Sequence, residues 1–312
     1  MAEAIRTEKL GKVYTAHGRR TVALTDVDLA VPSGIIYGLI GRNGAGKTTF
    51  IRITSTQLMP TSGRVLVLGT DAVADPRGVR SRIAVIPQES RPLYFLNVDE
   101  LVYLYLKVRG MDSAEARRRT NAVLEELGLT SRRKTIVSYL SGGMRRRAMV
   151  AMVLASDAEV LYLDEPTTGL DPIARREVWS AIQRASREHR TVLLTTHYLD
   201  EAEALSARLA LIEGGKVLLE GSPSDIRSRI KRPFRVTVSG AVGRSELEPY
   251  GEVTEIAGGH LVFARESDAR ELTLFALTKG IPVAMAPASL EDVFLQVVGR
   301  PIDTADEEEK EE

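Results

Sequence analysis

Residues Gly41–Thr49 read GRNGAGKTT and fit the phosphate-binding pattern G-x-x-x-x-G-K-[ST] at every fixed position. Glycines let backbone N–H groups converge on a polyphosphate, because no Cβ blocks the approach. Lys47 is expected to reach the β- and γ-phosphates, and the Thr48 hydroxyl to ligate Mg²⁺. The sequence therefore predicts a nucleotide-phosphate site formed by Gly41, Arg42, Asn43, Gly44, Ala45, Gly46, Lys47, Thr48 and Thr49.

The segments on both sides of this loop support the interpretation. The apolar run over residues 35–40 predicts a buried strand, and residues 49–53 predict the helix that follows it. The N-terminus of such a helix favours an anionic phosphate group. Farther along, apolar strands alternate with helices over residues 160–213, which predicts a largely parallel α/β sheet.

A pair of carboxylates follows the apolar run at residues 160–163, in the segment VLYLDE. A buried strand that ends at the phosphate site would hold Asp164 toward the Mg²⁺ ion. Glu165 would lie one residue further along, where it could polarise an attacking water molecule. Together with a phosphate loop, this pattern indicates phosphate hydrolysis more strongly than a strand that simply ends in solvated acids.

The composition excludes several other kinds of site. The 312 residues include no cysteine, so disulfides, thiolate metal sites and cysteine nucleophiles are excluded. Lys plus Arg and Asp plus Glu both number 42, and no basic stripe points to a nucleic-acid partner. We expect no signal peptide in residues 1–10, and no apolar run reaches the roughly 18 residues that a membrane span needs.

The chain is expected to form two domains and a tail. Residues 5–31 alternate apolar and polar and predict antiparallel strands ahead of the phosphate loop. We expect a nucleotide-binding domain over residues 1–230, with a helical subdomain at about residues 90–155. Residues 231–300 predict a small α+β domain, and the acidic residues 301–312 predict disorder.

The segment Leu140–Met144, LSGGM, lies about twenty residues before the carboxylate pair. A helix that begins there would offer the Ser141 hydroxyl and backbone N–H groups to a γ-phosphate. With these motifs in this order, the chain resembles the ATP-binding cassette ATPases over most of residues 5–223, and their signature is usually LSGGQ. In that family the phosphate belongs to a second subunit. The resemblance assigns its contacts to Ser141, Gly142, Gly143 and Met144, with methionine in place of glutamine.

The resemblance also gives roles to four further residues. Gln88 is similar to the glutamine that contacts Mg²⁺ and the attacking water, and His197 to the switch histidine that senses the γ-phosphate. Asp171 resembles the D-loop residue that links the two sites of a dimer, and Tyr14 lies where an aromatic ring stacks on adenine. The family's cofactors are ATP and Mg²⁺. The implied catalytic residues are Glu165, His197 and Gln88, and the implied metal ligands are Thr48, Gln88 and Asp164.

Residues 287–295, PASLEDVFL, narrow the resemblance. They are similar to the C-terminal segment of the daunorubicin-resistance type of bacterial and archaeal export ATPases, although an amphipathic helix packed in its own domain would show the same spacing. Those ATPases have one nucleotide-binding domain per chain and a separate membrane permease. The resemblance implies the motor subunit of an exporter at the cytoplasmic face of a prokaryotic membrane. Its implied partners are a second copy or a homologous ATPase, in an ATP-sandwich dimer, and a separate permease.

Two alternatives use the same motifs. One is a soluble cassette ATPase acting on ribosomes or DNA, but such chains usually carry two cassettes or a long coiled coil, and no heptad run occurs here. The other is a regulatory module with slow turnover and no transport role, which the presence of both Glu165 and His197 disfavours.

Two shorter segments lie outside these motifs. Residues 93–96, LYFL, are either part of a groove for a permease helix or ordinary core of the helical subdomain. The run Arg145–Arg147 predicts a solvated face of the signature helix.

Deletion of the acidic tail is expected to leave ATP hydrolysis intact. The tail has no apolar residue beyond Ala305 with which to pack, and its like charges repel one another. Truncation after Thr304, followed by a phosphate-release assay, checks this expectation. A folded truncated protein with much lower activity would contradict it.

Overall fold

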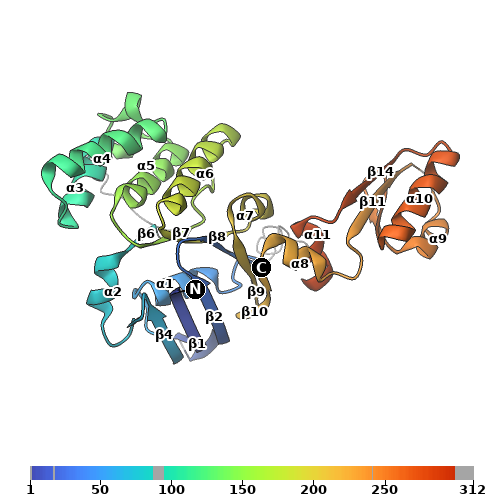
Figure 1. Ribbon diagram of the computed structural model, residues 1–312, viewed down its shortest axis with the longest axis horizontal. Helices are drawn as coiled ribbons and strands as arrows, with labels where there is room; N and C mark the ends of the chain where they lie inside the picture. Colours follow the sequence, from blue (N-terminus) through green and yellow to red (C-terminus); the bar gives the residue numbers. More distant parts are fainter. Residues whose placement is uncertain (1, 17, 87–94, 241, 299–312) are drawn as a thin grey trace. The chain divides into compact units, whose positions relative to one another are not determined.

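The computed structural model describes residues 2–16, 18–86, 95–240 and 242–298. The chain divides into two units, Met1–Glu220 and Gly221–Glu312, with separate sheets (Figure 1). This division falls ten residues before the boundary expected at residue 230, because helix α8 (Pro223–Ser228) packs on α11 (Leu290–Val298) of the second unit. The acidic tail expected over residues 301–312 lies outside the described residues.

A six-stranded sheet with the order β10-β9-β3-β8-β7-β6 forms the centre of the first unit. Within it, β3 pairs in parallel with β8 and β9, and β7 pairs in parallel with β6 and β8. The carboxyl ends of β3, β7 and β8 therefore lie at the same edge of the sheet. The strands are β3 (Ile36–Ile40), β6 (Ile83–Ile86), β7 (Val160–Asp164), β8 (Thr191–Thr196), β9 (Arg208–Glu213) and β10 (Lys216–Gly221).

The antiparallel strands predicted over residues 5–31 are confirmed. Strand β1 pairs antiparallel with both β2 and β4, in a sheet with the order β2-β1-β4-β5. Its strands are β1 (Glu3–Ala16), β2 (Arg19–Pro32), β4 (Ser62–Val67) and β5 (Thr70–Asp71).

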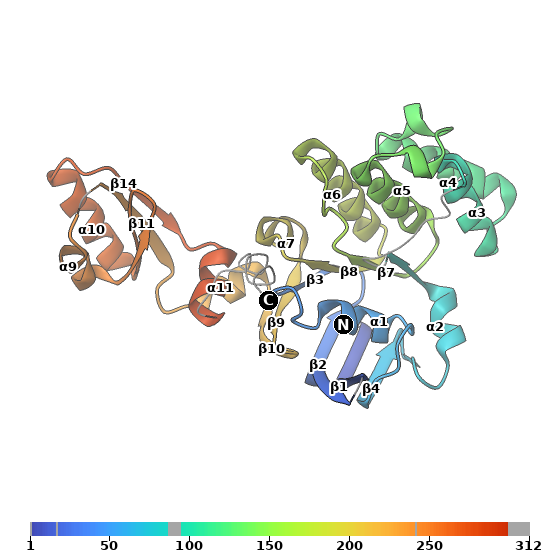
Figure 2. The ribbon, with the colours of Figure 1, turned by 180° about the vertical axis from the view of Figure 1, so that it is seen from behind.

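The helices of this unit include three, α3, α4 and α5, in the helical subdomain expected at about residues 90–155. Figures 1 and 2 show α3, α4, α5 and α6 gathered on one side of the central sheet, with β1, β2 and β4 on the other. The helices are α1 (Lys47–Thr54), α2 (Pro76–Arg82), α3 (Val98–Val108), α4 (Ser113–Glu126), α5 (Gly142–Ala155), α6 (Pro172–Arg187) and α7 (Leu199–Leu205), with short 3₁₀ turns η1 (Thr130–Arg132) and η2 (Val137–Tyr139).

The central sheet separates two hydrophobic cores. Because successive side chains of a strand point to opposite faces, Leu161 and Leu163 of β7 pack with the helical layer while Tyr162 packs with α1 and the antiparallel sheet. Tyr162 is fully buried, and its hydroxyl donates to the carbonyl oxygen of Thr54 at 3.1 Å. Burial on both faces explains the apolar runs VLYL in β7 and VLL in β8.

The second unit is an α+β fold with its own core. Its antiparallel sheet has the order β12-β13-β11-β14, and α10 packs against it through Ala269 and Leu272. Its elements are β11 (Phe234–Ser239), α9 (Arg244–Leu247), η3 (Glu248–Tyr250), β12 (Glu252–Ile256), β13 (Gly259–Ala264), α10 (Glu266–Thr278) and β14 (Val283–Pro287). None of the helices in the described ranges has the length and hydrophobicity that a membrane crossing requires.

A buried carboxylate holds the helical layer together. Asp99, on α3, is 3% exposed, and its Oδ2 accepts a hydrogen bond from Arg117 of α4 at 2.7 Å. Its Oδ1 accepts a hydrogen bond from Arg133, which follows η1. Burial acts to raise the pKa of Asp99, but the hydrogen bonds from Arg133 and Arg117 outweigh it and hold the pKa below its usual value.

The variant Asp99→Asn is expected to lower the free energy of unfolding by about 1–3 kcal/mol at neutral pH, since charge-assisted hydrogen bonds are lost. A carboxylate whose pKa is depressed on folding stabilises the protein above its unfolded pKa, and this contribution disappears as pH falls through the folded pKa. Urea unfolding of both proteins should therefore show that their difference in free energy of unfolding becomes smaller as the pH falls through the acidic range. A difference that does not change with pH would contradict this role of the charge.

Candidate functional site

The phosphate loop connects β3 to α1, as its sequence predicts. Gly46 has φ 111°, and a Cβ there would lie 2.6 Å from the carbonyl oxygen of Ala23. A Cβ on Gly41 would lie 2.2 Å from the carbonyl oxygen of Ile212. Neither position can hold a larger residue without moving backbone, so both glycines are required by the packing around the loop.

A hollow of about 200 Å³ opens at this loop. Lys47 is 5% exposed, and its ammonium group donates to the carbonyl oxygens of Gly41 at 2.6 Å and Arg42 at 3.0 Å. Burial lowers the pKa of Lys47, and the charges of Glu165, Asp164 and Glu213 oppose this effect. The hollow is lined by Ala23, Arg42, Asn43, Gly44, Gly46, Lys47, Thr48, Thr49 and Glu165.

Asp164 is the last residue of β7 and is 1% exposed. One of its oxygens accepts a hydrogen bond from the Thr195 hydroxyl of β8. Burial raises the pKa of Asp164, while hydrogen bonding from the Thr195 and Thr48 hydroxyls opposes the rise. The Thr48 hydroxyl and the Asp164 carboxylate thus lie together, and a cation between them would offset the desolvation of this charge.

These oxygen donors fit Mg²⁺, which binds one or two carboxylates together with the phosphates of a substrate. The described ranges contain no group of three or more His, Cys, Asp or Glu residues that could hold a metal ion unaided. A metal site here therefore depends on nucleotide phosphates for the remaining ligands.

Glu165 follows β7 and has a left-handed backbone with φ 50°. Its side chain is buried and faces the phosphate loop, with Oε1 at 3.9 Å from Nζ of Lys47 and 3.3 Å from Nδ1 of His197. Oε2 accepts a hydrogen bond from Thr168 at 3.3 Å. Burial acts to raise the pKa of Glu165, but the hydrogen bond and charge of His197 and the charge of Lys47 hold it below its usual value.

His197 comes directly after β8, so the parallel pairing of β7 and β8 brings it to Glu165. Its ring packs on Tyr198 with a centroid distance of 4.1 Å, and the guanidinium of Arg175 lies over the Tyr198 ring at 4.3 Å. These contacts orient the imidazole beside the carboxylate.

Tyr14 lies near the same loop. It extends from β1 and its hydroxyl is 3.3 Å from the hydroxyl of Thr49, while its ring is partly exposed beside the ammonium of Lys12 at 5.3 Å. An exposed aromatic face next to a phosphate loop is suited to stacking on a nucleobase, and this role stays a prediction.

The signature residues lie at the start of α5 and do not line the hollow. Ser141 is the N-cap, and its hydroxyl accepts a hydrogen bond from the N–H of Met144 at 3.2 Å. Ser141 and Gly142 are exposed, and a Cβ on Gly143 would lie 3.3 Å from the carbonyl oxygen of Gly169. The signature and the segment at residues 169–171 are thus neighbours within one chain.

Asp171 caps helix α6. Its Oδ1 accepts hydrogen bonds from the N–H groups of Ile173 and Ala174, both at 3.0 Å. This helix-capping role is by itself a sufficient explanation for an aspartate at this position. Its contribution at a dimer interface stays a prediction, and Gln88 lies outside the described residues.

The expectation that Arg145–Arg147 form a solvated face is wrong. Arg147 is 14% exposed in its side chain and pairs with Glu177 of α6 at 3.0 Å. Arg146 donates to the carbonyl oxygens of Asp164 and Glu165, the latter at 2.7 Å. No sequence pattern indicates the contacts of Arg146, because backbone acceptors leave no charge pattern. Thr195 was missed for a related reason, since threonine is an ordinary residue of a buried strand.

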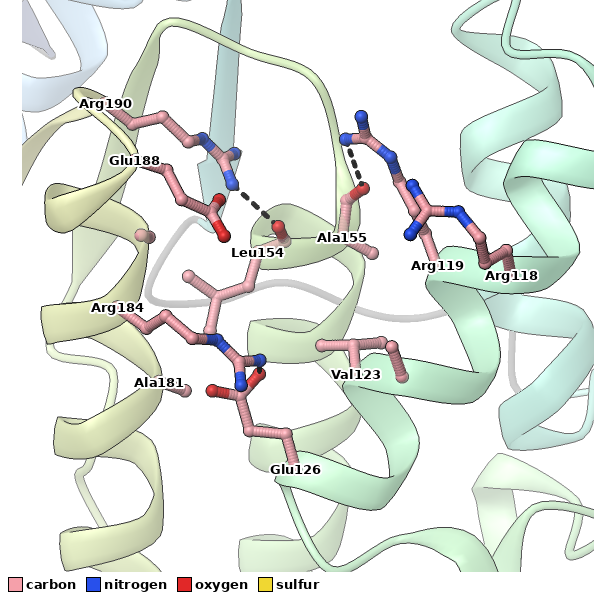
Figure 3. A pocket seen from close by; sticks show the side chains of 12 residues that line it. Arg118, Arg119, Val123, Glu126, Leu154, Ala155, Ala181, Arg184, Glu188 and Arg190 are labelled. Atoms are coloured by element: carbon pink, nitrogen blue, oxygen red, sulfur yellow. Dashed lines mark hydrogen bonds and ion pairs between the residues drawn. The ribbon is translucent and has the colours of Figure 1, made fainter.

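A second hollow, of about 310 Å³, lies between α4, α5 and α6 (Figure 3). Arg190 donates to the carbonyl oxygen of Leu154 at 2.8 Å, and Arg119 donates to that of Ala155 at 3.3 Å. Burial lowers the pKa of Arg190 to about 10. Arg184 pairs with Glu126. Arg119 and Arg190 neutralise the carboxyl end of α5. No phosphate-loop residue lines this hollow, so it is not the nucleotide site.

Comparison with known proteins agrees with this geometry. A family model described as ABC transporter matches residues 24–168. The daunorubicin/doxorubicin resistance ATP-binding protein DrrA of Streptomyces peucetius is 35% identical, with 98% of this chain and 96% of that protein covered. A Nod factor export ATP-binding protein I of Cupriavidus pinatubonensis is 37% identical, with 94% and 90% covered.

Solved structures show the same fold. An ATP-binding subunit of an ABC transporter matches with a TM-score of 0.66 and 28% identity, covering 72% of this chain and 92% of that one. A dimeric ATP-binding cassette bound to ADP and Pi matches with a TM-score of 0.65 at 23% identity, covering 70% and 98%. The α/β fold of the ATP-binding cassette type, predicted from the motifs, is confirmed. The chain belongs to the ABC transporter family, in which it is an ATPase and the ATP-binding subunit of an exporter.

Proposed function

We propose that two copies of this chain, or one copy and a homologous ATPase, enclose two MgATP molecules at their interface. In each site the phosphate loop of one chain faces Ser141 to Met144 of the other. The dimeric cassette similar in fold to this chain supports the arrangement. Closure and hydrolysis would drive a separate membrane permease.

The observation that carries this proposal is the separation of the two phosphate-binding elements within one chain. The hollow at the phosphate loop contains Lys47, Thr48 and Glu165 but none of the signature residues. The start of α5 nevertheless has an exposed serine and glycine at a helix N-terminus, which is an anion-binding arrangement. A second chain lets both elements act on one nucleotide.

The proposed site residues divide the work as follows. Lys47 and the loop N–H groups would bind the β- and γ-phosphates, and Tyr14 would support the adenine. Thr48, Asp164 and Gln88 would hold Mg²⁺, which supplies charge stabilisation to the phosphates. Glu165, with a pKa held below its usual value, would be ionised and able to accept a proton from water. His197 would fix the orientation of that carboxylate and contact the γ-phosphate.

A permease would dock on the helical subdomain. Of the predicted groove over residues 93–96, residues 93 and 94 lie outside the described residues, and Phe95 is 73% exposed. Val108, at the end of α3, is 88% exposed. Both side chains are accessible to a partner helix. The assembly would place this chain at the cytoplasmic face of a prokaryotic membrane, and cosedimentation with membranes that contain the permease would test that location.

The variant Lys47→Ala is expected to abolish productive MgATP binding while leaving the fold intact. The ammonium group of Lys47 lies buried in the hollow, so its loss removes the charge that partners the transferred phosphate. Calorimetry and a phosphate-release assay measure binding and turnover, with Lys216→Ala on the exposed start of β10 as the matched control. Near-normal turnover of Lys47→Ala would exclude the assigned site.

The variant Glu165→Gln is expected to hold the chain as an ATP-bound dimer. Glutamine keeps the shape of the side chain but cannot accept a proton from water, so the γ-phosphate is not cleaved. Because ATP would bind the dimer in preference to the monomer, it stabilises the dimer by mass action. Light scattering with and without MgATP measures the change in mass.

Addition of Ser141→Arg to Glu165→Gln should return the protein to a monomer, since a bulky cation would occupy the place of the partner's phosphate. A Glu165→Gln protein that is monomeric and hydrolyses ATP normally would refute both the catalytic role and the sandwich. One that is monomeric and inactive would keep the catalytic role and make dimerisation depend on the permease.

A further inference from the structure

We infer that Arg146 is a positioning residue for Glu165, clamping the backbone turn that aims this carboxylate at the phosphate loop. Its guanidinium donates through Nη2 to two consecutive carbonyl oxygens, those of Asp164 and Glu165. The inference rests on the proposed function, in which Glu165 activates water.

The turn needs such a clamp because its backbone is strained. Glu165 has φ 50°, in the left-handed region that residues other than glycine rarely adopt because their Cβ approaches the following carbonyl oxygen. Its own N–H is fixed on the other side, by the Thr195 carbonyl and hydroxyl oxygens, both at 3.1 Å. Arg146 and Thr195 therefore hold this residue from two elements, and the conformation persists because both constrain it.

The electrostatic setting also suits a positioning role. Burial lowers the pKa of Arg146, and the nearby charges of Asp164, Glu165 and Glu201 oppose this effect. Because Arg146 binds backbone oxygens, the Glu165 carboxylate remains directed to His197 and Lys47. Loss of the guanidinium would leave two buried carbonyl groups without this donor and would free the turn to relax.

The position of Arg146 on α5 makes the clamp rigid. The carboxyl end of the same helix is held by Arg119 and Arg190 (Figure 3). The far end of α5 is thus anchored. From this helix, Arg146 reaches the end of β7, which the catalytic carboxylate follows. Side chains locked on rigid elements position catalytic groups most precisely.

The test compares Arg146→Gln and Arg146→Lys with Arg147→Gln. Arg147 is the matched control, because it is a partly buried arginine of the same helix that contacts Glu177 and not β7. We expect Arg146→Gln to lower kcat about 10²-fold, the effect typical of a misplacement near 1 Å, with KM changed less than about twofold. Arg146→Lys, which keeps one charged donor, should be intermediate, and Arg147→Gln should retain kcat.

Two readouts separate positioning from a purely structural role. Added to Glu165→Gln, Arg146→Gln should reduce the residual single-turnover rate no further, because nothing is left to position. The same double variant should still form the ATP-dependent dimer, since the phosphate loop and signature are untouched.

A lost dimer, an additive loss of rate, or an equal loss of kcat in Arg147→Gln would overturn the inference. If Arg146→Gln does not fold, Arg146→Lys with wild-type kcat would overturn it. Full turnover by Glu165→Gln alone would instead refute the proposed function.

Discussion

The parallel pairing of three strands is the constraint on which the site depends. Strands β3, β8 and β7 are neighbours and point the same way, so the segments that follow them meet at one edge. Lys47 comes after β3, Glu165 after β7 and His197 after β8. They are far apart in sequence, yet Oε1 of Glu165 lies 3.9 Å from Nζ of Lys47 and 3.3 Å from Nδ1 of His197. A change in strand order would separate them without altering any motif.

The site also contains buried charges and a strained backbone, which are unfavourable by themselves and which the surrounding fold stabilises. Lys47, Asp164 and Glu165 are charged groups with 5%, 1% and 6% exposure, and Glu165 has a left-handed backbone. Desolvation of each charge is offset by its neighbours, so removal of one would leave the others poorly compensated. Both faces of β7 are covered by separate cores, which gives the strand end the rigidity that this arrangement needs.

The sequence predicted the elements whose patterns are local. The phosphate loop, the buried strands β3, β7 and β8 and the capping serine of α5 all follow from residue type and spacing. Strand β10 was missed, because its apolar run, residues 217–219, is only three residues long and none of the three is buried. Arg146 was misread as solvated, since an arginine that binds backbone carbonyls looks in sequence like any surface cation. The contact between the hydroxyls of Tyr14 and Thr49 could not be predicted from the sequence, because it depends on how the antiparallel sheet folds.

In the proposed dimer, one chain holds two complementary half-sites, and hydrolysis needs one half-site from each of two chains. A complementation assay tests it most directly, with Lys47→Ala and Ser141→Arg proteins mixed in equal amounts. The first protein lacks a working phosphate loop and the second lacks a working signature, so each alone should be inactive. A mixed dimer regains one composite site, so its ATP hydrolysis is expected to be well above that of either protein alone. A mixture as inactive as its components, or an active Ser141→Arg protein by itself, would rule out the two-chain site.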